Sequence, residues 1–292
     1  MPRRGWLLFG AMGVIWGVPY LLIKIAVKDL SPPVVVFGRT SIAAIVLVAL
    51  AWRAGAIRPA LQHWRYVLLF AAIEMALPWI LLTNAEKRLP SGITGLLVSC
   101  VPLVGAVVAF LLGDRTALRP IRLLAIGLGM AGVGLLVARD LGSSGHVPWW
   151  SVAEVLLVCV GYASAPFLAV RRLGSVPTLG VIAVSLGSVA IVYAPIAWLA
   201  RPEHAPPAKA LWAVLGLAII CTGIAFVVFF ALIDAVGPDR ATLITFVNPA
   251  VAVLLGAVVL DEHVTVATVA GFALVLCGCW LATLRTHPAP AA

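Results

Sequence analysis

Long apolar runs separated by short polar turns repeat along the whole chain. Ten runs reach the ~20 residues that a helix needs to cross the core of a bilayer. They cover residues 6–27, 33–52, 66–84, 92–113, 121–138, 149–170, 178–199, 210–232, 241–260 and 266–284. The pattern predicts an all-α membrane protein with ten transmembrane helices, and the short connections favour no soluble domain.

Two of these runs carry the same pattern. Residues 90–115 and 237–262 each begin with a Pro/Gly turn, contain one internal proline (Pro102 or Pro249) and reach an aspartate twelve residues later. A repeat of about half a chain is difficult to explain by chance. We therefore read the chain as two copies of one membrane unit.

Each unit holds five apolar runs, and an odd number reverses the orientation of the second unit in the membrane. We expect two inverted five-helix repeats at residues 1–141 and 149–286, with a linker at 142–148 and a disordered tail at 287–292. Many secondary transporters share this design, with interrupted helices near the midplane. The expected fold thus points to transport.

Composition and charge agree with a membrane protein. With 63% hydrophobic and 11% charged residues, the chain is not a soluble globule. Its net charge of +9 does not require nucleic acid, because basic residues anchor cytoplasmic loops. Twelve basic residues fall on one side of the expected topology and six on the other, which predicts a cell-membrane protein with both termini cytoplasmic.

The sequence offers little for catalysis or metal binding. All five histidines lie in expected loops or the tail, there is no HExxH motif, and the cysteines lack zinc-ligand spacing. We expect no cofactor, no metal and no enzymatic activity, although an intramembrane enzyme and a structural membrane protein stay as alternatives. The expected partners are a small-molecule substrate and the lipid bilayer, with no nucleic acid, in a monomer or homodimer.

Glu74 is the sharpest candidate for a functional residue. It lies at the centre of the third run, where an ionisable side chain costs roughly 3 kcal/mol on insertion scales and usually faces a wet cavity. We expect it to contact substrate, carry a coupling proton, or both. The alternative is that Glu74 is a structural partner for Lys24 or for a hydroxyl of another helix. The turn that follows, at residues 86–88, is expected to close this helix on the outside.

Other candidates are basic, aromatic or helix-breaking. Lys24 and Arg39 lie within about two turns of the outer face, where they bind a carboxylate or phosphate, form a structural pair, or snorkel to the headgroups. A proline within a span frees a backbone carbonyl, which the adjacent Asn248 or a ligand can satisfy. Pro102 and Pro249 are expected to be paired flexible points. Aromatic side chains that either line a cavity or merely pack are Trp16, Tyr20, Tyr162 and Phe246.

The order of these features resembles the ten-helix drug/metabolite transporter superfamily, EamA type, over essentially the whole chain. The residues that carry the resemblance are Trp16-Gly17, Lys24, Pro32, Arg39, Leu89-Pro90-Ser91-Gly92, Pro102, Gly113-Asp114, Gly237 to Ala241, Pro249, Asp261-Glu262 and Gly271/Gly278. The resemblance implies two inverted units around a central cavity, with export of a small metabolite or drug by alternating access. Proton coupling and simple facilitation are both represented in the family.

The chain departs from the family pattern in two places. Third helices of the family tend to be apolar or aromatic where this one has Glu74. The first helix also lacks the acidic residue that smaller multidrug relatives use for cation and proton exchange. These departures argue against a simple multidrug antiporter.

Overall fold

A computed structural model describes residues 3–111, 113, 120–140, 148–237 and 241–283. Every regular element in this part of the chain is helical, which confirms the all-α prediction. Asp114, nearly all of the expected linker and the expected tail lie outside the described residues.

The first half contains the following elements, in chain order: α1 (Arg3–Ala26), α2 (Pro32–Arg53), α3 (Ile57–Gln62), α4 (Trp64–Ala71), the π-helix η1 (Ala72–Ala76), α5 (Leu77–Ala85), α6 (Ser91–Val98), α7 (Val101–Leu111) and α8 (Pro120–Asp140). The second half contains α9 (Trp149–Arg172), α10 (Thr178–Leu199), α11 (Ala208–Ala218), the π-helix η3 (Ile219–Ile224), α12 (Ala225–Val236), the 3₁₀-helix η4 (Thr242–Phe246), α14 (Asn248–Leu260) and α15 (Val266–Thr283).

These helices supply the expected membrane spans. Eight helical stretches of the described chain are long and apolar enough to cross a bilayer. They include Trp64–Ala85, which joins α4, η1 and α5, and Ala208–Val236, which joins α11, η3 and α12. The other two expected spans correspond to α8 and α15, whose described apolar stretches are shorter. Large apolar side chains such as Trp52 and Leu199 are exposed on the outer surface, as in a protein surrounded by lipid.

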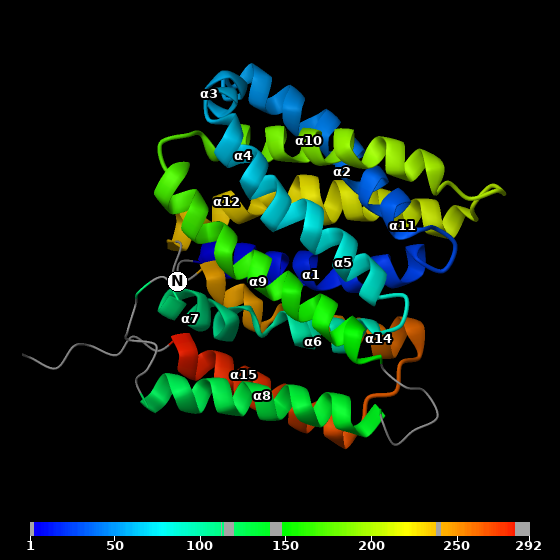
Figure 1. Ribbon diagram of the computed structural model, residues 1–292, viewed down its shortest axis with the longest axis vertical. Helices are drawn as coiled ribbons and strands as arrows, with labels where there is room; N and C mark the ends of the chain where they lie inside the picture. The colour runs from blue at the N-terminus through cyan, green and yellow to red at the C-terminus, as the bar shows by residue number, and fades with distance from the viewer. Residues whose placement is uncertain (1–2, 112, 114–119, 141–147, 238–240, 284–292) are drawn as a thin grey trace, which may run out of the picture.

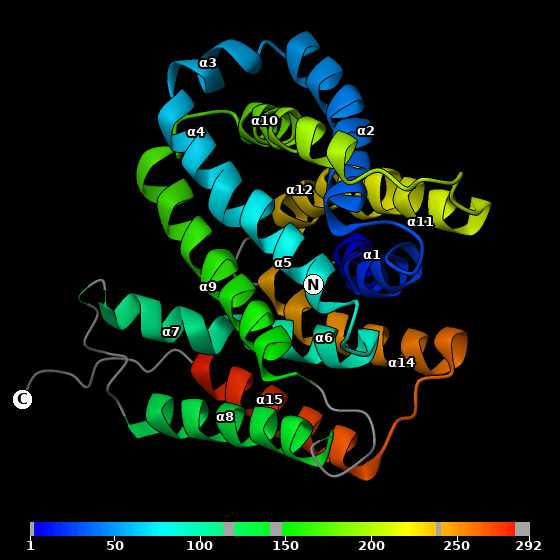
Figure 2. The ribbon, with the colours of Figure 1, turned by 45° about the vertical axis from the view of Figure 1, so that its right-hand side comes forward.

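Equivalent helices of the two halves pack against each other. The second helix of each half forms the pair α2 and α10, and the fifth forms the pair α8 and α15, at opposite ends of the molecule (Figure 1). The first helix of each half crosses to the fourth of the other, so that α1 packs on α14 and α9 on α6 and α7. Figure 2 shows α1 between the pair α2 and α10 and the pair α8 and α15. The halves are therefore interlocked.

Two of the expected continuous helices are interrupted, at matching places. The run at 92–113 stops after α6, turns at Ser99 and Cys100, and restarts as α7. The run at 241–260 begins as η4 and continues as α14. Pro102 and Pro249 each lie in the first turn of the restarted helix, where the missing proline N–H leaves no bond unmade.

The two π-helices match as well. They begin at Ala72 and Ile219, which are 147 residues apart, and the same separation relates Pro102 to Pro249. A π-turn interrupts regular hydrogen bonding and is frequent at functional sites. The shared spacing supports two copies of one unit, while their opposite orientation in the membrane stays a prediction.

Candidate functional site

Arg39 lies at the junction of the two halves. Its side chain is 8% exposed, and its Nε donates a hydrogen bond to Thr222 Oγ1 at 2.9 Å. Its guanidinium carbon lies 3.7 Å from the ring centroid of Trp79. Helix α2 thus presents Arg39 to α5 and η3, and the side chain does not reach toward headgroups as the snorkelling alternative required.

The Arg39 guanidinium has donors to spare. A guanidinium carries five N–H groups, and only Nε has a hydrogen-bond acceptor among the described residues. The one ion pair within the described part of the chain joins Arg88 and Glu154, so no described carboxylate pairs with Arg39. A buried charge is costly without a partner, and an Arg fork matches carboxylate and phosphate geometry. The arrangement is suited to an anionic group of a ligand.

Two tyrosines lie near Arg39, and one of them also lies near Glu74. Tyr20 in α1 and Tyr162 in α9 both lie within electrostatic reach of the guanidinium. Tyr162 also lies within reach of Glu74, a half-buried residue of η1. No hydrogen bond or ion pair of the described residues involves the Glu74 carboxyl. Four of the expected residues therefore gather around one place, which we call the central site.

The central site draws on both halves and on both π-helices. Tyr162 packs against two separate apolar clusters, one around α1 and α11 and one around α2 and α10. Glu74 comes from η1, and Thr222, which the sequence had not marked, comes from η3. Trp79 was also missed. A threonine or a tryptophan in an apolar helix does not mark a functional site in the sequence, because its role becomes clear only when the structure places a cation beside it.

The other aromatic candidates and Lys24 lie elsewhere. Trp16 packs on Phe229 of α12 with ring centroids 4.7 Å apart, and Phe246 packs beside the cluster of α7, α8 and α15. Lys24 Nζ donates to the backbone oxygens of Glu86 at 2.7 Å and Leu89 at 2.8 Å. Lys24 therefore caps the end of α5 and does not pair with Glu74.

Asn248 lies at the helix break, beside Pro249. With its amide nitrogen oriented toward them, it donates to Ile244 O at 3.0 Å and Gly13 O at 3.1 Å. At the break in the first half, Leu97 O accepts a hydrogen bond from Cys159 Sγ of α9 at 3.4 Å. Leu97 and Ile244 are 147 residues apart, so equivalent carbonyls at the two breaks receive different side-chain donors. A ligand role for Asn248 stays a prediction, and the use of Cys159 was not foreseen.

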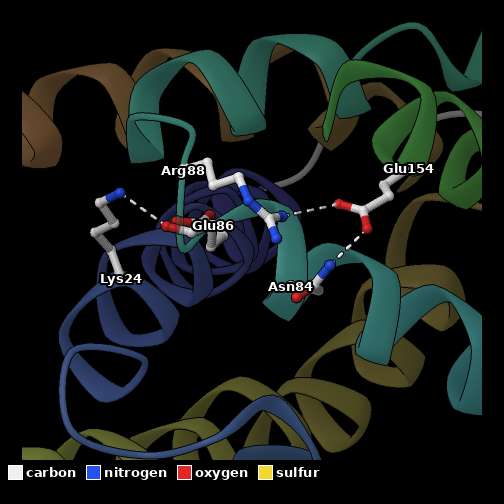
Figure 3. Close-up of polar contacts among 5 residues, drawn as sticks. All are labelled: Lys24, Asn84, Glu86, Arg88 and Glu154. Atoms are coloured by element: carbon white, nitrogen blue, oxygen red, sulfur yellow. Dashed lines mark hydrogen bonds and ion pairs between the residues drawn. The ribbon is translucent and has the colours of Figure 1, made fainter. Parts of the chain in front are cut away.

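A second polar group lies at the end of α1 and was not anticipated. Glu86, expected in an outer turn, is 0% exposed. Nearby, Glu262 accepts hydrogen bonds from Ser91 N at 2.7 Å and Gly92 N at 3.0 Å, which satisfies the first turn of α6 from the other half of the chain. Figure 3 shows Lys24 beside Glu86, and Glu154 facing Asn84 and Arg88.

An apolar groove of about 680 Å³ lies away from both polar groups. It runs between α2 and α11 and is lined by residues such as Phe37, Leu211 and Trp212. Leu211 and Trp212 are exposed on the surface that carries other large apolar side chains. The groove thus belongs to the lipid-facing surface.

Comparison with known proteins gives the family. The model of the EamA-like transporter family matches residues 3–138 and 149–284. The chain belongs to the EamA-like transporter family. It is therefore a multi-pass integral membrane protein of the drug/metabolite transporter type, as the sequence features predicted.

Relatives of this EamA-like transporter carry transporter names. The chain is 31% identical over 259 residues to "Uncharacterized inner membrane transporter YedA" of Escherichia coli (strain K12), with 85% of this chain and 81% of the relative covered. It is 25% identical over 299 residues to "Uncharacterized transporter YvbV" of Bacillus subtilis (strain 168), with 98% and 93% covered. One solved crystal structure matches 97% of each chain with a TM-score of 0.67 at 23% identity, which shows the same fold.

Proposed function

We propose that this EamA-like transporter exports a small metabolite or drug across the cell membrane by alternating access, with the substrate held at the central site. The observation that carries the proposal is the Arg39 guanidinium, which is buried between the halves without a carboxylate partner among the described residues. A buried cation of this kind is expensive to keep. A transported anionic group that shares its charge would account for its presence.

The central site suits alternating access because both halves build it. Arg39, Glu74 and Trp79 come from the first half, and Tyr162 and Thr222 from the second. A rocking movement of one half against the other would open the site to one side and then to the other. Pro102 and Pro249 restart interrupted helices at equivalent positions, which supports their proposed role as flexible points.

Glu74 is the proposed coupling group. It lies within electrostatic reach of Tyr162, which also lies within reach of Arg39. A carboxyl there can accept a proton when the site faces one side and release it on the other. Export driven by proton entry follows if substrate and proton leave the site in opposite directions.

The test begins with the substrate. A thermal-shift screen of small metabolites and drugs on the purified protein selects ligands, and a labelled hit is then followed into proteoliposomes. The proposal expects substrate movement that depends on Arg39 and responds to a pH gradient. Movement that ignores the gradient would make the protein a facilitator. Absence of any movement for tightly bound hits would contradict transport at this site.

A further inference from the structure

A polar group with two fully buried members, Glu86 and Ser91, joins the two halves at the end of α1. It consists of Lys24, Glu86, Ser91 and Glu262, and we call it the Glu86 cluster. Lys24 is in the last turn of α1, Glu86 follows α5, Ser91 begins α6, and Glu262 follows α14. Helices α1, α6 and α14 pack against one another around it. The cluster therefore sits where the halves must separate if this end opens.

Glu86 has no partner for its carboxyl group. The side chain is 0% exposed, and both of its carboxyl oxygens are buried without a hydrogen bond. The Lys24 ammonium, shown beside it in Figure 3, donates instead to two backbone oxygens, those of Glu86 and Leu89. Ser91 Oγ is also buried without a partner. The cluster thus has unused polar atoms at its centre.

The surrounding charges are few and are already engaged. From α1, Tyr20 and Lys24 lie within electrostatic reach of Glu86, and from the segment after α14 so does Glu262. Glu262 is held by two backbone N–H groups of α6. On the α9 side, Glu154 accepts a hydrogen bond from Asn84 and pairs with Arg88, away from the Glu86 carboxyl (Figure 3).

These surroundings favour the neutral form of Glu86. An ionised carboxylate without a hydrogen bond is among the most costly groups to bury, and a protonated one is far less so. Glu86 follows directly after the membrane-spanning stretch Trp64–Ala85. Burial raises its pKa well above the ordinary range; the Lys24 charge opposes this shift and the Glu262 charge adds to it.

We propose that Glu86 is a proton-binding site whose occupancy holds this end of the transporter closed. The proposal rests on alternating access only for the existence of an open state. When the halves separate here, water reaches Glu86 and the carboxyl ionises at its ordinary pKa. The proton therefore binds the closed state more tightly than the open state.

The sign of the pH effect follows from this difference. Protonation of Glu86 stabilises the closed state in full below the ordinary carboxyl pKa of about 4.3. The contribution is lost as the pH rises through the raised pKa of the closed state. Between these limits, each pH unit shifts the balance toward the open state by up to about tenfold. A rise in pH on the side of the membrane where the Glu86 cluster lies therefore shifts the transporter toward the state that is open at this end.

A cysteine at position 91 reports the opening. Ser91→Cys is nearly isosteric, and the replaced hydroxyl makes no hydrogen bond. On a background without native cysteines, an impermeant maleimide labels this thiol only when the end is open. The same reporter in Glu86→Gln corrects for the pH dependence of the thiol, because glutamine mimics the protonated carboxyl. Glu154→Gln is the matched control, since Glu154 already has partners.

We expect labelling to rise with pH several-fold more steeply with Glu86 than with Glu86→Gln, and Glu154→Gln to behave as the parent. Equal pH dependence with and without Glu86 would overturn the proposal. A change in labelling that depends on sodium at constant pH, and disappears when an organic cation replaces sodium, would also overturn the proposal. If the variants are unstable, infrared spectroscopy of Glu74→Gln, which keeps Glu86, must show a protonated carboxyl that is titrated above the ordinary range. A protein that opens with pH but moves no solute would refute the proposed function and leave this inference standing.

Discussion

At the scale of single residues, Arg39 is the position at which a substrate-binding role can be tested separately from a structural one. Its planar group bonds Thr222 through Nε and stacks on Trp79 at the same time. A lysine has a point charge and cannot do both. The role of Arg39 can therefore be tested with a substitution that leaves the net charge unchanged.

Arg39→Lys should lower the affinity for a substrate found by the screen about tenfold or more, because the fork is lost while the charge stays. The measurement is a titration of thermal shift or of transport rate. Arg201→Lys is the matched control, since Arg201 stacks on Trp198 at 4.3 Å on the exposed surface. If the two lysine variants bind equally well, Arg39 does not hold the substrate.

Glu74→Gln should fold, bind substrate and lose the pH dependence of transport. The expectation follows from a carboxyl in the central site that no described residue bonds. Glutamine keeps the shape and removes the titration. Transport rates across a series of pH values, in wild type and variant, check it. Unchanged pH dependence would assign the coupling proton elsewhere.

At the scale of elements, a carbonyl at each helix break accepts a side-chain hydrogen bond in addition to a backbone one. Asn248 donates hydrogen bonds to the backbone oxygens of Ile244 and Gly13, and Cys159 donates one to the backbone oxygen of Leu97. Breaks inside a membrane are tolerated only when freed backbone groups find partners. The donors therefore belong to the structure of each break.

Asn248→Leu should lower the free energy of unfolding by about 1–3 kcal/mol, because two side-chain hydrogen bonds to backbone oxygens are lost. Cys159→Ser should stay within about 1 kcal/mol of wild type, since the hydroxyl can still donate to the Leu97 carbonyl. Thermal unfolding in detergent compares them. Equal stability of Asn248→Leu and wild type would show that water or another group satisfies the break.

The packing of α10 against the turn between α2 and α3 depends on close backbone approach. A Cβ at Gly180 would overlap the Ala56 carbonyl, whereas one at Gly187, on the same helix, meets nothing within 4 Å. Gly180→Ala should cost about 1–3 kcal/mol by overpacking. Gly187→Ala should gain about 0.5–1 kcal/mol in helix propensity. Unfolding temperatures that do not differ between the two would contradict the described helix contact.

At the scale of the whole molecule, the sequence predicted what periodic apolar runs can encode. Ten spans and the repeat follow from run length and spacing. Arg39 and Glu74 stood out because charges within apolar runs are rare. The helix breaks and the π-turns did not stand out, since a run of apolar residues is compatible with a continuous helix and with an interrupted one. Glu86 looked like a turn residue, because its burial depends on α1 and the segment after α14.

The central claim is that one site between the halves is reached in turn from each side of the membrane. Thr222 is 0% exposed and bonds Arg39 at that site. A single cysteine at position 222, in a chain without native thiols, can be probed with an impermeant reagent from either side. Leu186→Cys, in the closed packing of α2 and α10, is the control. The account predicts labelling of Thr222→Cys from both sides and of Leu186→Cys from neither. Labelling of Thr222→Cys from one side only would contradict alternating access at this site.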